Sequence, residues 1–185
     1  MVGWYVPNSD RVHKVSIIAR GMMGVYTRFL PTEDRYFYSK SQFEGILAGL
    51  LAGHVAEEIV FGDMTTGPSN DIERATGIAR KMITEYGMSK RIGPRTLGHK
   101  EELIFLGRDI GEQKSYSEKS AEAIDDDITA LIDAAYGRAK VILTTHRYIL
   151  EALALRLIKQ ETIEGEELAK ILSAAGSEPE LAPAG

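Results

Sequence analysis

The feature that most constrains the fold is a long helical pattern in the C-terminal half of the chain. From about Ser115 or Ser117 onward, apolar residues recur at intervals of three and four. They are Ile124, Ile128, Leu131, Ile132, Ala135, Ala139, Ile142 and Leu143. This spacing gathers the apolar side chains on one helical face, which must be buried against other elements. The sequence therefore predicts a mainly α (α+β) fold built around one long amphipathic helix.

A second helix is predicted to end at Phe61, because Gly62 is a typical residue just past a helix C-terminus. Ser39 and Ser41 are both possible N-caps, and Ser41 followed by Glu44 fits a capping box. This segment is largely apolar and carries a row of glycines at four-residue spacing, which favours close approach of another helix. The row is Gly45, Gly49 and Gly53. Its several charged residues indicate a buried helix of a soluble protein rather than a membrane span.

Three further helices follow from local signals. Asn70 with Glu73 fits another capping pattern, and an apolar stripe then runs up to Gly87. Residues 88–114 are rich in glycine and proline and are predicted to form a loop with one short strand. Residues 147–160 and 165–173 are predicted to be helical.

The N-terminal third favours a β-hairpin. His13–Ala19 and Gly24–Leu30 are rich in β-branched residues and are separated by a glycine-containing turn. An exposed second strand would bind an extended peptide through its free backbone groups, so it is a candidate substrate-binding edge. Its candidate residues are Gly24, Val25, Tyr26 and Thr27. The alternative is an ordinary hairpin strand that packs on the core.

The charge and the cysteine content argue against two kinds of function, nucleic-acid binding and thiolate metal binding. The net charge is 22 − 27 = −5 with both signs interleaved, so the chain lacks the basic surface that nucleic acid requires. There is no cysteine, which excludes disulfides and thiolate metal sites.

One dense motif carries a family resemblance. TTGPSNDIERAT, Thr65 to Thr76, resembles the TTGxxNDxxxAT signature of FtsH-type ATP-dependent zinc metalloproteases. Flanking motifs agree in order, among them HKVSIIARG, LPTEDRYFYSKSQ, AEEIVFG, ARKMITEYGMS and FLGRD. The resemblance implies that residues 1–176 are a helical peptidase domain with a small N-terminal sheet, followed by a disordered tail at 177–185.

The same resemblance implies a zinc site. In the family an HExxH helix supplies two histidine ligands and a catalytic glutamate, and an aspartate of the TTGxxND segment is the third ligand. By position that aspartate is Asp71. From its place alone, the commoner role of such an aspartate is to cap a helix or match its dipole, and only the resemblance favours the ligand role of Asp71. Glu57 and Glu58 are candidates for orienting a ligand, or could simply pair with Arg or Lys.

The sequence departs from the family pattern at one point. No HExxH occurs in the 185 residues, and Val2-Gly3-Trp4 resembles the sequence that follows it in the family. The expectation is a peptidase domain truncated at its N-terminus, which neither binds catalytic zinc tightly nor cleaves peptides alone. His13, His54, His99 and His146 lack ligand spacing and do not suggest a replacement site.

For the whole protein the resemblance implies a hexamer, driven by ATP and Mg²⁺ in an AAA module, that degrades unfolded or membrane proteins. No GxxxxGK[ST] loop for such a module is present here. The whole protein would be anchored in the bacterial inner membrane, or an organellar one, with this domain on the cytoplasmic side and itself soluble. Two alternatives stay open. One is a non-catalytic helical oligomerisation or interaction module, formed by the amphipathic helices from 115 to 173. The other is an inactive family member, against which the match around Asp71 argues.

Overall fold

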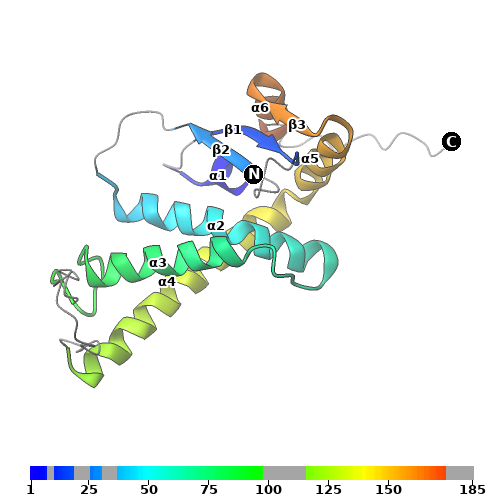
Figure 1. Cartoon of the computed structure of the whole chain (residues 1–185). Helices are drawn as coiled ribbons and strands as arrows, with labels where there is room; N and C mark the ends of the chain where they lie inside the picture. Colours follow the sequence, from blue (N-terminus) through cyan, green and yellow to red (C-terminus); the bar gives the residue numbers. More distant parts are fainter. Residues whose placement is uncertain (8–10, 19–25, 31–36, 98–115, 174–185) are drawn as a thin grey trace, which may run out of the picture.

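The computed structural model describes residues 1–7, 11–18, 26–30, 37–97 and 116–173 (Figure 1). Three helices pack together on one side of the molecule: α2 (Lys40–Phe61), α3 (Ser69–Thr84) and α4 (Glu118–Thr145). A small sheet lies on the other side of α2, with α5 (Arg147–Gln160) and α6 (Gly165–Ser173) beside it. This arrangement confirms the mainly helical fold with a small β element.

The long amphipathic helix is confirmed as α4. Its N-cap is Ser117, whose hydroxyl accepts a hydrogen bond from the Ser120 N–H at 3.3 Å. The predicted apolar stripe faces α2 and α3, and five of its members are buried: Ile124, Ile128, Ala135, Ala139 and Leu143. Together with Leu47, Met82 and other side chains they belong to the larger of the two hydrophobic cores that the described residues form.

Of the two possible N-caps of α2, Ser39 is the one used, whereas the capping box expected from Ser41 and Glu44 is wrong. Gln42 completes the box instead by accepting from the Ser39 N–H at 2.7 Å. Ser41 lies inside the first turn and its hydroxyl contacts that of Ser39. The C-terminal signal was right, since Gly62 ends the helix with φ 66° in the left-handed region.

The start of α3 also differs from the expected Asn70 cap. The helix begins at Ser69 after Pro68, and no side chain caps it. Pro68 is buried, and its ring sets φ at −77° before the first turn. The helix ends at Thr84, before Gly87, whose positive φ and close approach to Pro94 belong to the following turn.

The sheet has three strands in the order β2-β1-β3. β1 (Arg11–Ser16) pairs antiparallel with β2 (Tyr26–Leu30), which confirms the predicted hairpin. β3 (Thr162–Glu164), which local patterns did not predict, pairs with the other edge of β1. A second hydrophobic core lies beneath this sheet and α5 and α6: Val12, Ile149, Leu153, Ile163, Leu168 and Leu172.

The short helix α1 (Val2–Tyr5) joins the two regions, since it contacts α2, α4 and β1. The glycine row of α2 partly accommodates it, because a Cβ on Gly45 would come within 2.8 Å of Val6. Among the described residues nothing lies within 4 Å of a Cβ on Gly49 or Gly53. Among the described residues, the glycine face of α2 beyond α1 therefore has no packed neighbour.

Several predictions fall outside the described residues. They concern Ala19, Gly24, Val25, most of the 88–114 loop and the tail at 177–185. Within the described ranges, no helix has the length and apolar character needed to cross a membrane.

Candidate functional site

Asp71 lies in the first turn of α3, as the motif predicted. Its side chain is 47% exposed, and its nearest charged partner is Arg74, with Nη1 at 3.6 Å from Oδ1. A carboxylate in this place is stabilised by the free N–H groups and the positive end of the helix dipole. Asp71 is thus an accessible carboxylate that its own side-chain contacts hold only loosely.

The turn that leads into α3 is ordered by a threonine. The hydroxyl of Thr65 accepts a hydrogen bond from the Gly67 N–H at 3.0 Å, a local turn typical of threonine. Two residues later the Ser69 N–H donates to the Thr66 carbonyl at 3.1 Å, and α3 begins. The TTGPSND motif therefore forms a compact turn followed at once by α3, with Asp71 in the first turn of that helix.

Glu57 reaches this turn from the last part of α2. Its Oε2 accepts from the Thr65 N–H at 2.8 Å, and its Oε1 accepts from the Thr65 hydroxyl at 3.0 Å. The structure thus brings Glu57 together with the motif that carries Asp71. Glu57 was predicted from the sequence as an orienting residue, but its partner Thr65 was not, although a threonine two residues before a glycine is a recognisable turn signal.

Glu58 points to a different neighbour. Its carboxylate accepts hydrogen bonds from the Tyr136 hydroxyl and, at 2.9 Å, from the Lys140 ammonium, both on α4. The Tyr136 hydroxyl, followed by Lys140, holds the pKa of Glu58 below its usual range, because both stabilise the charged form. In the described residues, Glu58 therefore ties α2 to α4 and does not contact the Thr65 turn.

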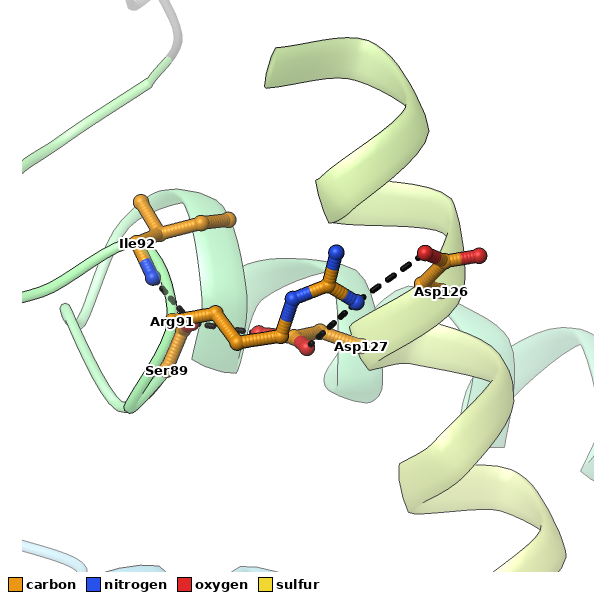
Figure 2. A network of polar contacts seen from close by, with 5 residues as sticks. All are labelled: Ser89, Arg91, Ile92, Asp126 and Asp127. Atoms are coloured by element: carbon orange, nitrogen blue, oxygen red, sulfur yellow. Dashed lines mark hydrogen bonds and ion pairs between the residues drawn. The ribbon is translucent and has the colours of Figure 1, made fainter. Parts of the chain in front are cut away.

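The segment just after α3 is held to α4 by another polar network, shown in Figure 2. The buried Ser89 donates its hydroxyl hydrogen to Asp127 of α4 and accepts from the Ile92 N–H at 2.8 Å. Arg91 reaches Asp126 at 3.0 Å and Asp127 at 3.8 Å. The helix that carries Asp71 is thus connected to α2 at its start and to α4 just after its end.

The three described histidines do not form a metal-holding group with Asp71. His13 is exposed on β1, and His146 stacks on Tyr5 with ring centroids 4.0 Å apart. His54 is half-buried on α2, and within the described residues its Nδ1 has no hydrogen-bond partner. His99 lies outside the described residues. In the part of the chain that the structure describes, no three His, Asp or Glu side chains are close enough to hold a metal ion.

The predicted substrate-binding strand is at an edge of the sheet. β2 pairs with β1 on one side, and no described strand pairs with its other side. Tyr26 and Thr27 begin this strand, opposite Ser16 and Val15, whereas Gly24 and Val25 lie outside the described residues.

Comparison with known proteins agrees with the motif. The model of Peptidase family M41 matches residues 1–171. An ATP-dependent zinc metalloprotease FtsH 1 of Sphaerobacter thermophilus is 55% identical over 98% of this chain, which covers 28% of that relative. The FtsH 1 of Thermomicrobium roseum is 53% identical over 98% of the chain and 28% of the relative. The Bacillus subtilis FtsH is 44% identical over 93% of the chain and 27% of the relative.

The chain therefore spans little more than a quarter of the length of these relatives. The identities extend over nearly the whole chain, and the family model includes every helix and strand except the last two residues of α6. This chain belongs to peptidase family M41.

Proposed function

We propose that this chain is part of the proteolytic domain of an ATP-dependent zinc metalloendopeptidase. The observation that carries the proposal is the TTGPSND turn, which presents an accessible Asp71 carboxylate at the start of α3. The relatives' names, ATP-dependent zinc metalloprotease, give the activity that this site would serve.

Asp71 is the proposed zinc ligand of this chain. Carboxylate oxygens bind Zn²⁺, and catalytic zinc sites use three protein ligands with one position open for water or substrate. One carboxylate fits this chemistry but does not complete it, and no three described His, Asp or Glu side chains lie together in a metal-holding group. The resemblance assigns the remaining ligands and the catalytic base to an HExxH helix. When bound, zinc would polarise the scissile carbonyl and activate a water molecule.

The open part of α2 suggests where such a helix would pack. α1 already contacts α2 at Gly45, and the space beside Gly49 and Gly53 is free of described residues. We propose that the HExxH helix occupies this face. A large residue at Gly49, such as Leu, should then abolish zinc binding in a protein that contains the helix, and full zinc binding by Gly49→Leu would exclude this packing.

The free edge of β2 is the proposed binding site for extended substrate. Backbone pairing along a strand edge reads no particular sequence, which suits degradation of unfolded, misassembled or short-lived proteins. Val25→Pro removes one backbone donor near the start of this edge and should slow degradation of an unfolded protein. Unchanged degradation would remove β2 from the substrate path.

The wider setting follows the relatives and is proposed for the whole protein only. It would be a membrane-anchored homo-hexamer, with ATP and Mg²⁺ bound in an AAA module and with this domain on the cytoplasmic side. Sedimentation of the whole protein should give a hexamer, and its recovery in the membrane fraction would test the anchor.

A direct test of activity uses a chimera in which this chain replaces the matching residues of the Sphaerobacter thermophilus relative. The chimera should degrade casein with ATP, and its Asp71→Ala variant should not. The 185-residue chain alone should be inactive, since it carries one proposed ligand. Casein cleavage by the chain alone, or by the Asp71→Ala chimera, would contradict the proposal.

The alternative function, a helical interaction module, has one observation in its favour. Apolar side chains are exposed on the C-terminal helices, with Val141 65%, Leu155 63% and Ile158 71% exposed. If these helices join subunits, Leu155→Glu with Ile158→Glu should dissociate the assembly without removing zinc. Unchanged assembly would exclude this face.

A further inference from the structure

The contact between Glu57 and Thr65 has a fixed direction. A carboxylate only accepts hydrogen bonds, so the Thr65 hydroxyl must give its single hydrogen to Glu57 Oε1 at 3.0 Å. A lone pair of that hydroxyl is then aimed at the Gly67 N–H, which donates to it at 3.0 Å. The second carboxylate oxygen binds the Thr65 N–H at 2.8 Å. One side chain of α2 thereby orders three donors of the turn.

Close packing at Gly67 shows how tightly the turn is drawn to this carboxylate. A Cβ on Gly67 would lie 3.2 Å from Thr65 Oγ1 and 3.5 Å from Glu57 Oε1. The first distance is shorter than ordinary van der Waals contact, so a side chain here would require the Thr65 hydroxyl to shift by a few tenths of an ångström. Glycine at position 67 lets the three groups meet without that shift.

The turn matters because the start of α3 has few polar side-chain contacts of its own. Pro68 is buried there, but among the described residues no side chain caps the helix, and Asp71 pairs with Arg74 alone, at 3.6 Å. The packing of α3 on α2 and α4 sets the course of the helix, and the backbone of residues 65–68 sets how its first turn is entered. Glu57 is a side chain from another helix that holds this backbone.

We propose that Glu57 is a positioning residue for Asp71, and that it acts through the Thr65 turn rather than by touching the metal. This inference rests on the proposed role of Asp71 as a zinc ligand and deepens it. Glu57 is adjacent to Glu58, whose carboxylate binds Tyr136 and Lys140 of α4 instead, so the chain supplies its own matched control.

The first test measures amide hydrogen exchange in the 185-residue chain. Glu57→Gln keeps the size of the side chain but replaces one acceptor with a donor. The Thr65 and Gly67 amides should then exchange about tenfold faster, because a bond to a charged group is lost. Glu58→Gln should leave both rates unchanged. Equal rates in Glu57→Gln and the unaltered chain would overturn the proposal.

A double-mutant cycle tests the route. Thr65→Val removes the hydroxyl, so the Gly67 amide should exchange faster in this variant. Adding Glu57→Gln should then have a much smaller further effect on Gly67, since the path through the hydroxyl is already gone and only the bond to the backbone N–H of residue 65 is left to lose. An additional effect of similar size would mean that Glu57 reaches the turn by another route.

The metal readout uses the chimera described above, with zinc competed against a chromophoric chelator. Glu57→Gln and Thr65→Val should each weaken zinc binding about tenfold, as expected for groups that orient a ligand. The double variant should lose little more zinc affinity than either single variant, and much less than the product of the two single losses. Full additivity would indicate that Glu57 contacts the metal itself and would overturn the proposal. If Asp71→Asn kept its zinc while the exchange results held, the ligand assignment would fail and the role of Glu57 in the turn would stand.

Discussion

The helical region, α2 with α3 and α4, and the sheet region, β1–β3 with α5 and α6, are assembled in different ways. The helical region buries long faces of consecutive helices against each other around Leu47 and Met82. The sheet region joins the two ends of the chain, because β1 pairs with β3, and Ser16 contacts Thr162 across 146 residues of sequence. The TTGPSND turn and every described side chain that holds it belong to the helical region.

Because of this difference, the stability of the fold and the geometry of the turn before Asp71 should respond to different substitutions. Changes in either region should lower the stability of the fold, whereas only changes near the α2–α3 junction should alter the turn before Asp71. Each region contains a comparable buried leucine, buried serine and paired glutamate, so the comparison can be tested with matched substitutions.

The largest effect is expected from the two cores. Leu47→Ala in α2 and Leu168→Ala in α6 each empty a fully buried position and should cost about 2–5 kcal/mol of unfolding free energy. Urea unfolding gives this cost. Amide exchange of Thr65, in an exposed loop that opens locally, should be unaffected by Leu168→Ala. Faster Thr65 exchange in Leu168→Ala would show that the two regions are not separable.

A smaller effect is expected from the two buried serines. Ser89→Ala leaves the mostly buried Asp127 carboxylate without its hydroxyl donor and should cost about 1–3 kcal/mol. Ser16→Ala removes a contact to the neutral Thr162 hydroxyl, which can turn to another partner, and should cost about 0.5–1.5 kcal/mol. Urea unfolding measures both losses. A larger loss of unfolding free energy in Ser16→Ala than in Ser89→Ala would contradict this ranking.

The smallest effect concerns pH. Hydrogen bonds from Tyr136 and then Lys140 lower the pKa of Glu58, and a hydrogen bond from Lys14 lowers that of Glu164. A lowered folded-state pKa contributes stability that is present above the unfolded pKa and is lost as the pH falls through the folded pKa. The thermal unfolding midpoint should therefore fall as the pH is lowered below about 4.

The two glutamates should differ in this loss. Glu58→Gln should reduce the acid dependence more than Glu164→Gln, because Glu58 has two donors and Glu164 has one. Identical acid profiles of the unaltered chain and Glu58→Gln would contradict the assignment of this pair.

The helical region could be predicted from sequence because its signals are local. Ser117 as N-cap, the three-four spacing of α4 and Gly62 at the end of α2 each act within a few residues. The errors at Ser41 and Asn70 have the same origin, since short capping patterns occur in competing registers. The structure selects Ser39, and at α3 it uses Pro68 without a side-chain cap.

The third strand could not be predicted for the opposite reason. Thr162–Glu164 is too short to show alternation, and its pairing with β1 depends on residues far away in the sequence. The site was predicted in part. The sequence motifs singled out Asp71 and, on the preceding helix, Glu57 and Glu58. Only the folded structure shows that Glu57 binds Thr65 whereas Glu58 binds α4.

The most direct test of the account is zinc per chain, measured by elemental analysis in the Sphaerobacter chimera with and without Asp71→Ala. Glu73→Ala, an exposed carboxylate of the same helix, is the control. We predict about one zinc per chain, lost in Asp71→Ala and retained in Glu73→Ala. Zinc retained at full occupancy in Asp71→Ala would contradict the account, because the TTGPSND turn would then not supply a ligand.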